Sequence, residues 1–217
     1  MNKAVVLFSG GQDSTTCLAW AKKDYEVYAL TIDYGQRHSK EVDCARKIAK
    51  EWHVPLIVYE MPSLAPLVQS ALLDPDLEIK DGDKFPNTFM PGRNMLFFTL
   101  AGAYAYQIGA HHVVGGMSQT DYSGYPDCRR GFITACSVAM AAALGDYWIE
   151  FLAPLLYKSK AKTFALAEKM GILKTVIGST MTCYEGKGEI FDWGMGCAKC
   201  PACILRKKGW EEFKGTQ

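Results

Sequence analysis

The first residues of the sequence contain no long hydrophobic run. The first apolar run, residues 4–8, ends at turn-forming residues and is too short for a signal peptide core or a membrane span. It also has no excess of one charge, because 24 Lys and Arg face 23 Asp and Glu, a formal net charge of +1. No global field then draws the chain to a polyanion or a membrane surface. We expect a cytoplasmic protein with no membrane contact and no direct nucleic acid binding.

Two common nucleotide-binding motifs are missing as well. The chain contains neither G-x-x-x-x-G-K-[ST] nor G-x-G-x-x-G, which argues against a kinase-like phosphate loop. It has no internal repeat or low-complexity tract, and its 217 residues suit one domain of ordinary size. We therefore expect a single domain over residues 1–217.

Short apolar runs alternate with longer stretches of helical periodicity. The apolar runs predict strands over residues 4–8, 27–33, 56–61, 111–117 and 148–154. The periodic stretches predict helices over residues 15–22, 39–52, 94–108, 132–144 and 159–169. This alternation predicts an α/β fold with a parallel sheet and helices on both faces. Residues 62–92 are rich in Pro, Asp and Gly, and predict a long loop with a short helix near 64–73.

The first strand is followed by SGGQDS, residues 9–14, here called the SGGQDS loop. It can be a plain strand-to-helix turn, in which Gly10 and Gly11 supply unusual dihedral angles and Asp13 or Ser14 caps the helix. It can also form an anion site from backbone N–H groups, the helix start and nearby hydroxyls. Because strand, loop and helix follow in the required order, we favour the phosphate site. The loop resembles that of the PP-loop ATP pyrophosphatases, which implies release of AMP and pyrophosphate, with Asp13 helping to hold Mg²⁺.

The eight cysteines fall into two groups. Disulfides are rare in cytosolic chains, so we expect thiols. Four cysteines near the C-terminus have the spacing C-x13-C-x2-C-x2-C and predict one structural Zn²⁺ per chain, although an iron–sulfur cluster fits the same ligand count. These four are Cys183, Cys197, Cys200 and Cys203. They belong to a glycine-rich stretch, residues 182–205, which we call the cysteine lobe and expect to be part of the main domain.

The other four cysteines are scattered along the chain. Cys17, Cys44 and Cys136 fall on predicted helices, where cysteine usually acts as a small core residue. Cys128 lies in a loop crowded with polar groups. This position makes Cys128 a candidate neighbour of a site.

Polar loops follow the second strand and precede the third predicted helix. Asp33 ends the predicted strand 27–33, and Tyr34, Gln36 and Arg37 follow it, where α/β proteins approach a nucleotide. His38 alone would suit a solvated loop. Arg93 follows Pro91 and Gly92 at a predicted helix start, a position that suits binding of phosphate or carboxylate, although a surface charge would look the same.

Acidic, aromatic and basic residues gather after the fourth strand. Acids can accept from an amidine-like N–H edge, tyrosines can stack on a flat ring, and arginine can face a carboxylate. Together they predict a pocket for a purine-like acid. The residues are Asp121, Tyr122, Tyr125, Asp127 and Arg129.

With these motifs, the chain resembles the QueC family of queuosine biosynthesis, a branch of the PP-loop ATP pyrophosphatases, over nearly its whole length. The resemblance rests on FSGGQDSTTCL (8–18), DYGQRH (33–38), PNTFMPGRN (86–94), TDYSGYPDCR (120–129), APLLYKSKA (153–161) and TCY…GCAKCPAC (182–203). It implies an adenine nucleotide alpha hydrolase-like fold and a homodimer. It also implies an ATP-dependent ligase that turns 7-carboxy-7-deazaguanine and ammonia into 7-cyano-7-deazaguanine through an acyl-adenylate and an amide.

The resemblance also implies roles for individual residues. Asp13, Arg93 and Lys160 would be catalytic, and the cysteines named above would hold zinc. ATP contacts would come from Phe8, Ser9, Gly10, Gly11, Gln12, Asp13, Ser14, Thr15, Thr16, Cys17, Leu18, Asp33, Gln36 and Arg37. Substrate contacts would come from Arg93, Asp121, Tyr122, Tyr125, Asp127 and Arg129.

The chain departs from the family pattern in two places. It has Ala153 and Lys162 where the family more often reads T-P-L…K-A-E, and residues 184–196 form a longer insert than usual. The insert could cover the pocket or meet a partner. Three alternatives therefore stay open: an enzyme joining the adenylated acid to an amine on another molecule such as a protein, a PP-loop enzyme that modifies tRNA, and a nucleotide-binding protein without catalysis.

Overall fold

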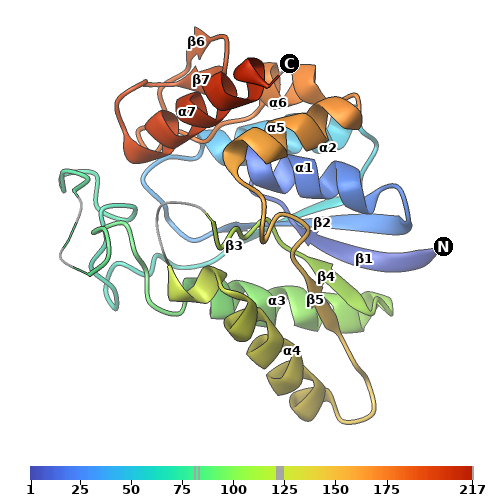
Figure 1. The fold of residues 1–217 in the computed structure, drawn as a ribbon. Helices are drawn as coiled ribbons and strands as arrows, with labels where there is room; N and C mark the ends of the chain where they lie inside the picture. The colour runs from blue at the N-terminus through green and yellow to red at the C-terminus, as the bar shows by residue number, and fades with distance from the viewer. Residues whose placement is uncertain (81, 83, 121–124, 217) are drawn as a thin grey trace.

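The computed structural model describes residues 1–80, 82, 84–120 and 125–216, and it is built around a parallel sheet (Figure 1). Five strands lie in the order β3-β2-β1-β4-β5, and each neighbouring pair is parallel. They are β1 Asn2–Leu7, β2 Tyr25–Asp33, β3 Leu56–Glu60, β4 His112–Val114 and β5 Glu150–Leu152. The predicted parallel α/β sheet is confirmed.

Helices cover both faces of the sheet (Figure 1). On one face lie α1 Gln12–Ala21 and α2 Lys40–Glu51, and on the other α3 Arg93–Ile108 and α4 Arg130–Leu144. Strand β1 serves both layers, because side chains alternate across a strand. Val6 packs with Leu18 and Ile48 on the α1 side, while Val5 packs with Phe98 on the α3 side.

The sheet order places a crevice beside β1. The chain runs outward from β1 through β2 to β3, then returns to the other side of β1 with β4. Connections therefore leave β1 and β4 in opposite directions at their carboxyl ends, which is where open α/β sheets bind ligands. The SGGQDS loop follows β1, and residues 115–118 follow β4.

The predicted helix near residues 64–73 is wrong, because the structure has only turns there. The amides of Leu67 and Val68 both donate to the Leu64 carbonyl, but the next turn does not continue. The Ala71 amide instead donates to the Asn87 carbonyl at 3.0 Å. This tertiary hydrogen bond replaces the one that a helix would have made.

The C-terminal part contains elements that the sequence patterns did not predict. Helix α5 Lys160–Lys169, near its predicted position, is followed by α6 Leu173–Ser179, then the antiparallel hairpin of β6 Glu189–Phe191 and β7 Gly194–Gly196, and α7 Pro201–Gly215. Phe164 of α5 packs against Trp210 and Phe213 of α7. These helices lie on the α1 side of the sheet (Figure 1). Among the described helices, none has the length and apolar character needed to cross a bilayer.

Candidate functional site

A cavity of about 340 Å³ opens at the carboxyl ends of β1, β2 and β4. Its volume falls within the roughly 300–1,000 Å³ typical of small-molecule sites. We call it the main cavity. Its polar and aromatic lining includes Ser9, Asp13, Ser14, Thr31, Tyr34, Gln36, Arg37, His38, Glu41, Arg93, Asn94, Phe97, Ser118, Tyr125, Cys128 and Tyr184.

The SGGQDS loop borders this cavity and ends in helix α1. Gly10 has φ +86°, and a Cβ there would lie 2.3 Å from the Glu41 carbonyl oxygen, so only glycine fits. Gly11 caps α1 without a side-chain hydrogen bond to the helix. The Ser9 and Ser14 hydroxyl oxygens are 3.1 Å apart. The loop thus presents hydroxyls and the positive end of a helix to the cavity, as an anion site requires.

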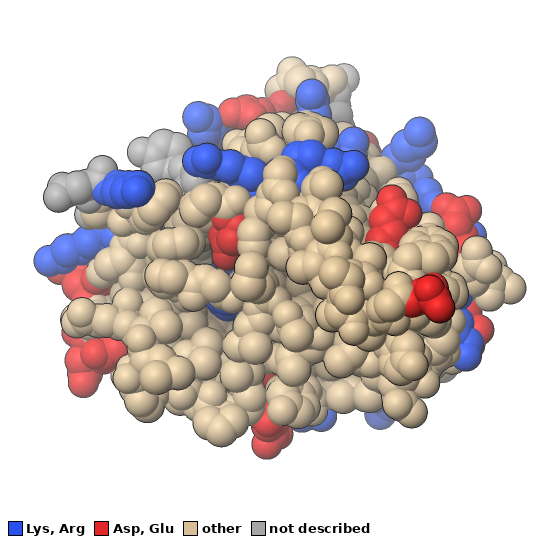
Figure 2. Space-filling view, turned by 90° about the horizontal axis from the view of Figure 1, so that it is seen from below, with Lys and Arg blue, Asp and Glu red and all other residues tan. Residues whose placement is uncertain are grey.

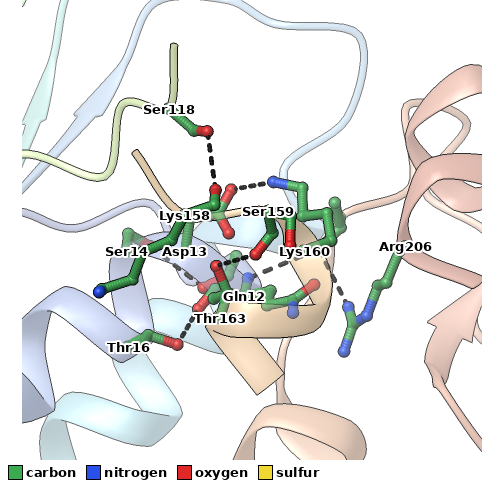
Figure 3. A network of polar contacts seen from close by, with 12 residues as sticks. Gln12, Asp13, Ser14, Thr16, Ser118, Lys158, Ser159, Lys160, Thr163 and Arg206 are labelled. Carbon is green, nitrogen blue, oxygen red and sulfur yellow. Dashed lines mark hydrogen bonds and ion pairs between the residues drawn. The ribbon is translucent and has the colours of Figure 1, made fainter. Parts of the chain in front are cut away.

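Asp13 and Lys160 form an ion pair at the edge of the cavity (Figure 3). Lys160 Nζ lies 2.5 Å from Asp13 Oδ2, and the Lys160 side chain is only 8% exposed. Lys160 is the first residue of α5, and a Cβ on Gly209 of α7 would lie 2.3 Å from its Cβ. The close approach of α7 therefore helps to hold Lys160 against the loop. Asp13 Oδ1 is buried with no hydrogen-bond partner among the described residues.

The rest of the 8–18 segment divides into cavity wall and core. Phe8 lines the cavity, whereas the side chains of residues 15–18 are buried away from its lining. Thr16 Oγ donates to the Gln12 carbonyl at 2.8 Å, and burial raises the pKa of the Cys17 thiol, which stays neutral. Gln12 is 1% exposed and also lies outside the lining. The expected ATP contacts of Gln12, Thr15, Thr16, Cys17 and Leu18 therefore do not appear as cavity-facing side chains in the described structure.

Arg93 reaches the cavity from the start of α3. Gly92 before it has φ +77°, which turns the chain into the helix. Burial by itself lowers the pKa of Arg93, but Tyr34, Tyr184 and Asp127 outweigh it and raise the pKa. Its Nε is buried with no partner among the described atoms. Arg93 is thus a fixed cation inside the cavity rather than a surface charge.

Glu41 is a cavity residue that sequence reasoning missed. It lies in the first turn of α2, and burial raises the pKa of its carboxyl to about 7, against the effect of Arg93. Its position just beyond the DYGQRH motif was the only sequence signal that could have found it.

The residues after β2 build the wall between the cavity and the long loop. Gln36 Oε1 accepts from the Tyr34 amide at 3.0 Å. Arg37 donates to the Ala71 and Leu77 carbonyls and pairs with Glu185 at 3.3 Å. Asp33 lies outside the lining and accepts from the Gly35 amide at 3.3 Å. Of the expected nucleotide contacts here, Gln36 and Arg37 face the cavity and Asp33 does not.

The structure brings together only some of the residues that were expected to bind a purine-like acid. Asp121 and Tyr122 lie outside the described residues. Tyr125 lines the cavity and its hydroxyl is 2.6 Å from Thr88 Oγ. Asp127 is 8% exposed and outside the lining, and burial raises the pKa of its carboxyl although Arg93 opposes this. Arg129 is exposed at the start of α4.

Cys128 lies beside the cavity, as expected. It lines the main cavity, and Asn94 Nδ2 lies 3.6 Å from its sulfur. Cys17, Cys44 and Cys136 pack among apolar side chains, as expected for core residues.

The four C-terminal cysteines form a cluster suited to one metal ion. The sulfurs of Cys183, Cys197, Cys200 and Cys203 all lie within 4.8 Å of one another. Ligands around tetrahedral zinc would have sulfurs about 3.8 Å apart, and Cys197 and Cys203 are 3.9 Å apart. The Lys199 and Cys200 amides point at the Cys197 sulfur. Hydrogen bonds from Cys200 and Cys203 lower the pKa of Cys183, while the same contacts with Cys183 raise the pKa values of Cys200 and Cys203.

The cysteine lobe contacts the cavity through residues next to a predicted metal ligand. Cys183 is followed by Tyr184, which lines the cavity, and by Glu185, which pairs with Arg37. The Cys183 carbonyl lies 2.8 Å from His38 Nε2. The β6–β7 hairpin of the long insert lies outside the cavity lining.

Arg206 of α7 ties the cysteine lobe to the SGGQDS loop (Figure 3). It is fully buried and donates to the carbonyls of Val176 and Trp193 and to the hydroxyls of Thr180 and Thr182. Thr182 Oγ in turn accepts from the Gln12 amide at 3.5 Å. Burial lowers the pKa of Arg206 to about 10, so it remains charged at neutral pH. Sequence patterns offered no signal for this residue.

The chain matches known proteins over nearly its whole length. The family described as queuosine biosynthesis protein QueC matches residues 3–214. The chain is 46% identical to a 7-cyano-7-deazaguanine synthase of Wolinella succinogenes, covering 98% of this chain and 94% of that protein. It is 47% identical to the Bacillus subtilis protein of the same name, covering 97% and 94%.

A solved structure supports the fold alone. A predicted subunit of tRNA methyltransferase from Methanocaldococcus jannaschii superposes with a TM-score of 0.50 at 19% identity, covering 77% of this chain and 75% of that one. The family match extends across the sheet, the SGGQDS loop and the cysteine cluster. The chain is therefore a member of the QueC family of queuosine biosynthesis proteins.

Proposed function

We propose that this chain is an ATP-dependent carbon–nitrogen ligase that converts 7-carboxy-7-deazaguanine and ammonia into 7-cyano-7-deazaguanine. One observation carries the proposal: the SGGQDS loop, with its Asp13–Lys160 pair, and Arg93 border the same cavity. An adenylating enzyme needs a polyphosphate site and a site for an organic acid side by side. The names of the two bacterial relatives support the same reaction.

The proposed reaction has two adenylation steps. The substrate carboxylate attacks the α-phosphorus of ATP, pyrophosphate leaves, and ammonia displaces AMP to form the amide. The amide oxygen then attacks a second ATP, and loss of two N–H protons and AMP leaves the nitrile. Each nitrile thus requires two ATP and releases two AMP and two pyrophosphate.

The chain's own groups serve this chemistry by position and charge. The N–H groups at the start of α1 and the Ser9 and Ser14 hydroxyls would bind the β,γ-pyrophosphate. Lys160 would stabilise the negative charge that develops as pyrophosphate departs. Asp13, with one oxygen on Lys160 and the other unpartnered, has the oxygen that Mg²⁺ needs. When bound, Mg²⁺ would neutralise leaving-group charge.

Arg93 and the aromatic residues would hold the acid. Arg93 can hydrogen-bond a carboxylate or a ring carbonyl with two parallel N–H groups. Tyr34 and Phe97, whose ring centroids are 5.4 Å apart, offer apolar surface to a flat ring. Holding the acid beside the nucleotide converts a bimolecular step into an effectively unimolecular one.

We also propose that the four clustered cysteines hold one structural Zn²⁺. The donor set is four thiols with no open position for a substrate. Zinc would supply no chemistry to the reaction, but it would hold Cys183 and therefore its neighbour Tyr184 in the cavity wall.

Mass spectrometry of products tests the ligase proposal. The chain is incubated with ATP, Mg²⁺, ammonia and the deazaguanine acid, and nitrile should form with two AMP per molecule. ATP consumption that does not depend on the acid would contradict the proposal. A conjugate with an added amine or protein, or turnover that requires tRNA, would instead identify one of the alternative acceptors. ATP binding without AMP release would indicate a non-catalytic protein.

A homodimer in the cytoplasm is part of the same proposal. Figure 2 views the molecule from the α3–α4 side and shows a broad face with few charged side chains. Arg93 is the only charged residue of α3 and Arg130 the only one of α4, and Tyr106 and Val138 are more than half exposed. Burying such a face desolvates few charges. Light scattering should give twice the 24.0 kDa chain mass.

A further inference from the structure

Among the described residues that line the main cavity, only Asp13 and Glu41 carry carboxylates. Asp13 is paired with Lys160 at 2.5 Å. For the Glu41 carboxylate, no hydrogen bond or ion pair is found within the part of the chain that the structure describes. Among the described lining residues, Glu41 is therefore the one whose carboxylate has both oxygens without a partner, whereas Asp13 has one.

The backbone at Glu41 is held tightly. The Glu41 carbonyl oxygen packs against Gly10, and a Cβ added to Gly10 would lie only 2.3 Å from that oxygen. Glu41 is also in the first turn of α2, directly after the wall formed by Gln36, Arg37 and His38. A side chain on so fixed a backbone can select a ligand by geometry.

The surroundings of Glu41 describe the ligand it suits. Arg93 is the neighbouring charge with the largest effect on its carboxyl. Tyr34 and Tyr184, both close to Arg93, supply aromatic surface. A divalent cation does not suit this place, because a fixed guanidinium stands nearby and no second free carboxylate is present among the described lining residues. A flat, neutral ring with N–H donors suits the surroundings of Glu41.

We infer that Glu41 recognises the N–H edge of the deazapurine ring by accepting hydrogen bonds from ring N1–H and the 2-amino group. The inference rests on the proposed function, since it names the residue that reads that substrate. Two parallel N–H groups match the two oxygens of one carboxylate. Asp127, which the sequence suggested for this role, is buried outside the lining.

The cost of burying the Glu41 carboxylate without donors should make it select ligands that supply N–H groups. A carboxylate kept from water without donors is costly, and burial already raises the pKa of Glu41 to about 7. The donor edge of the ring would supply the missing hydrogen bonds and stabilise the charged form. A ring without the 2-amino group would leave one acceptor unpaired, which is how polar sites reject analogues.

Glu41→Gln tests the inference, because glutamine keeps the size but loses the charge and one acceptor. Loss of a charge-assisted hydrogen bond should lower kcat/KM for the acid about 10- to 100-fold, with KM for ATP within about twofold. Asp43→Asn, an exposed carboxylate in the same helical turn, is the matched control and should behave as wild type. The acid analogue that lacks the 2-amino group should be disfavoured by wild type and much less by Glu41→Gln.

Three outcomes would overturn the inference. They are an unchanged kcat/KM for the acid, a rise confined to KM for ATP or Mg²⁺, and unchanged discrimination against the analogue. If Glu41→Gln does not fold, Glu41→Asp serves for the same measurements. Aspartate is shorter by one methylene, so its carboxylate would lie farther from the ring. Failure of the wild-type chain to make nitrile would refute the proposed function instead, so the two failures are distinguishable.

Discussion

Lys160 and Asp13 are 147 positions apart in the chain, yet Nζ and Oδ2 lie 2.5 Å apart. The loop motif pointed to Asp13, and only the family resemblance pointed to Lys160. Nothing local to Lys160 distinguishes it from Lys158 or Lys162, which flank it. At the scale of residues, the fold decides which of several similar side chains is buried against the SGGQDS loop.

Lys160→Met should lower the rate of AMP release about 100-fold or more, because it removes a preorganised cation from the proposed pyrophosphate site. Lys162→Met, an exposed neighbour on the same helix, is the matched control and should stay within about twofold of wild type. Initial rates of acid-dependent AMP release measure both. Equal losses in the two variants would mean that Lys160 acts through general surface charge.

Glu41 should make the ligand-free protein less stable as the pH rises. Its pKa is raised on folding from 4.5 to about 7, so the folded state retains a proton between these values. The stabilising contribution is complete below pH 4.5 and is lost as pH passes through 7. Glu41→Gln should therefore gain about 1–2 kcal/mol of unfolding free energy relative to wild type between pH 5 and 7.5.

Thermal or urea unfolding of the zinc-loaded protein measures this gain. Asp43→Asn should show a pH-independent difference from wild type. A Glu41→Gln difference that is constant over the same range would mean that the carboxyl is solvated in the folded state.

At the scale of elements, the β6–β7 hairpin and α7 pack together at two close approaches. Gly194 has φ +131°, and a Cβ there would lie 2.3 Å from Arg206 Nη2. A Cβ on Gly196 would lie 2.5 Å from the Cys203 sulfur. The glycines that marked this lobe in the sequence are thus partly spacers that admit a buried arginine and a predicted metal ligand.

Gly194→Ala should lower the free energy of unfolding by about 2–4 kcal/mol, since it adds backbone strain and displaces the fully buried Arg206. Gly188→Ala lies in the same lobe with nothing within 4 Å of the added Cβ, and should change stability by less than about 0.5 kcal/mol. Urea denaturation midpoints compare the two. Equal effects would show that Arg206 relaxes easily around the new methyl group.

At the scale of the whole molecule, the cysteine lobe joins the two ends of the chain at the cavity. Arg206 reaches Thr182, Thr182 reaches the SGGQDS loop, and Tyr184 lines the cavity. Disturbing the cysteine cluster should therefore affect both global stability and substrate binding.

Cys200→Ser should lose bound zinc, lower the unfolding free energy by several kcal/mol and weaken acid binding, because metal binding is coupled to folding. Cys136→Ser is the matched control, since Cys136 is buried in the α3–α4 core rather than in the cluster. It should lose stability but keep one zinc per chain. Elemental analysis and unfolding curves measure both, and full zinc content in Cys200→Ser would contradict the four-cysteine site.

Much of the fold was predictable because its signals are local. Buried parallel strands show as apolar runs, and the helices between them show a period near 3.6. Residues 64–73 and helix α7 were not predictable in the same way. The Ala71 amide is satisfied by Asn87, and α7 is stabilised by its packing on α5, so both depend on distant partners.

The sequence by itself determined the alternating architecture, the SGGQDS loop beside the first strand and the four-cysteine cluster, because each is encoded in composition or spacing over a few residues. Only the tertiary structure decided that Lys160 pairs with Asp13, that Asp127 lies outside the cavity lining, and that Glu41 lines the cavity with no partner among the described residues. These outcomes depend on burial and charge pairing between distant segments, and no short stretch of sequence carries that information.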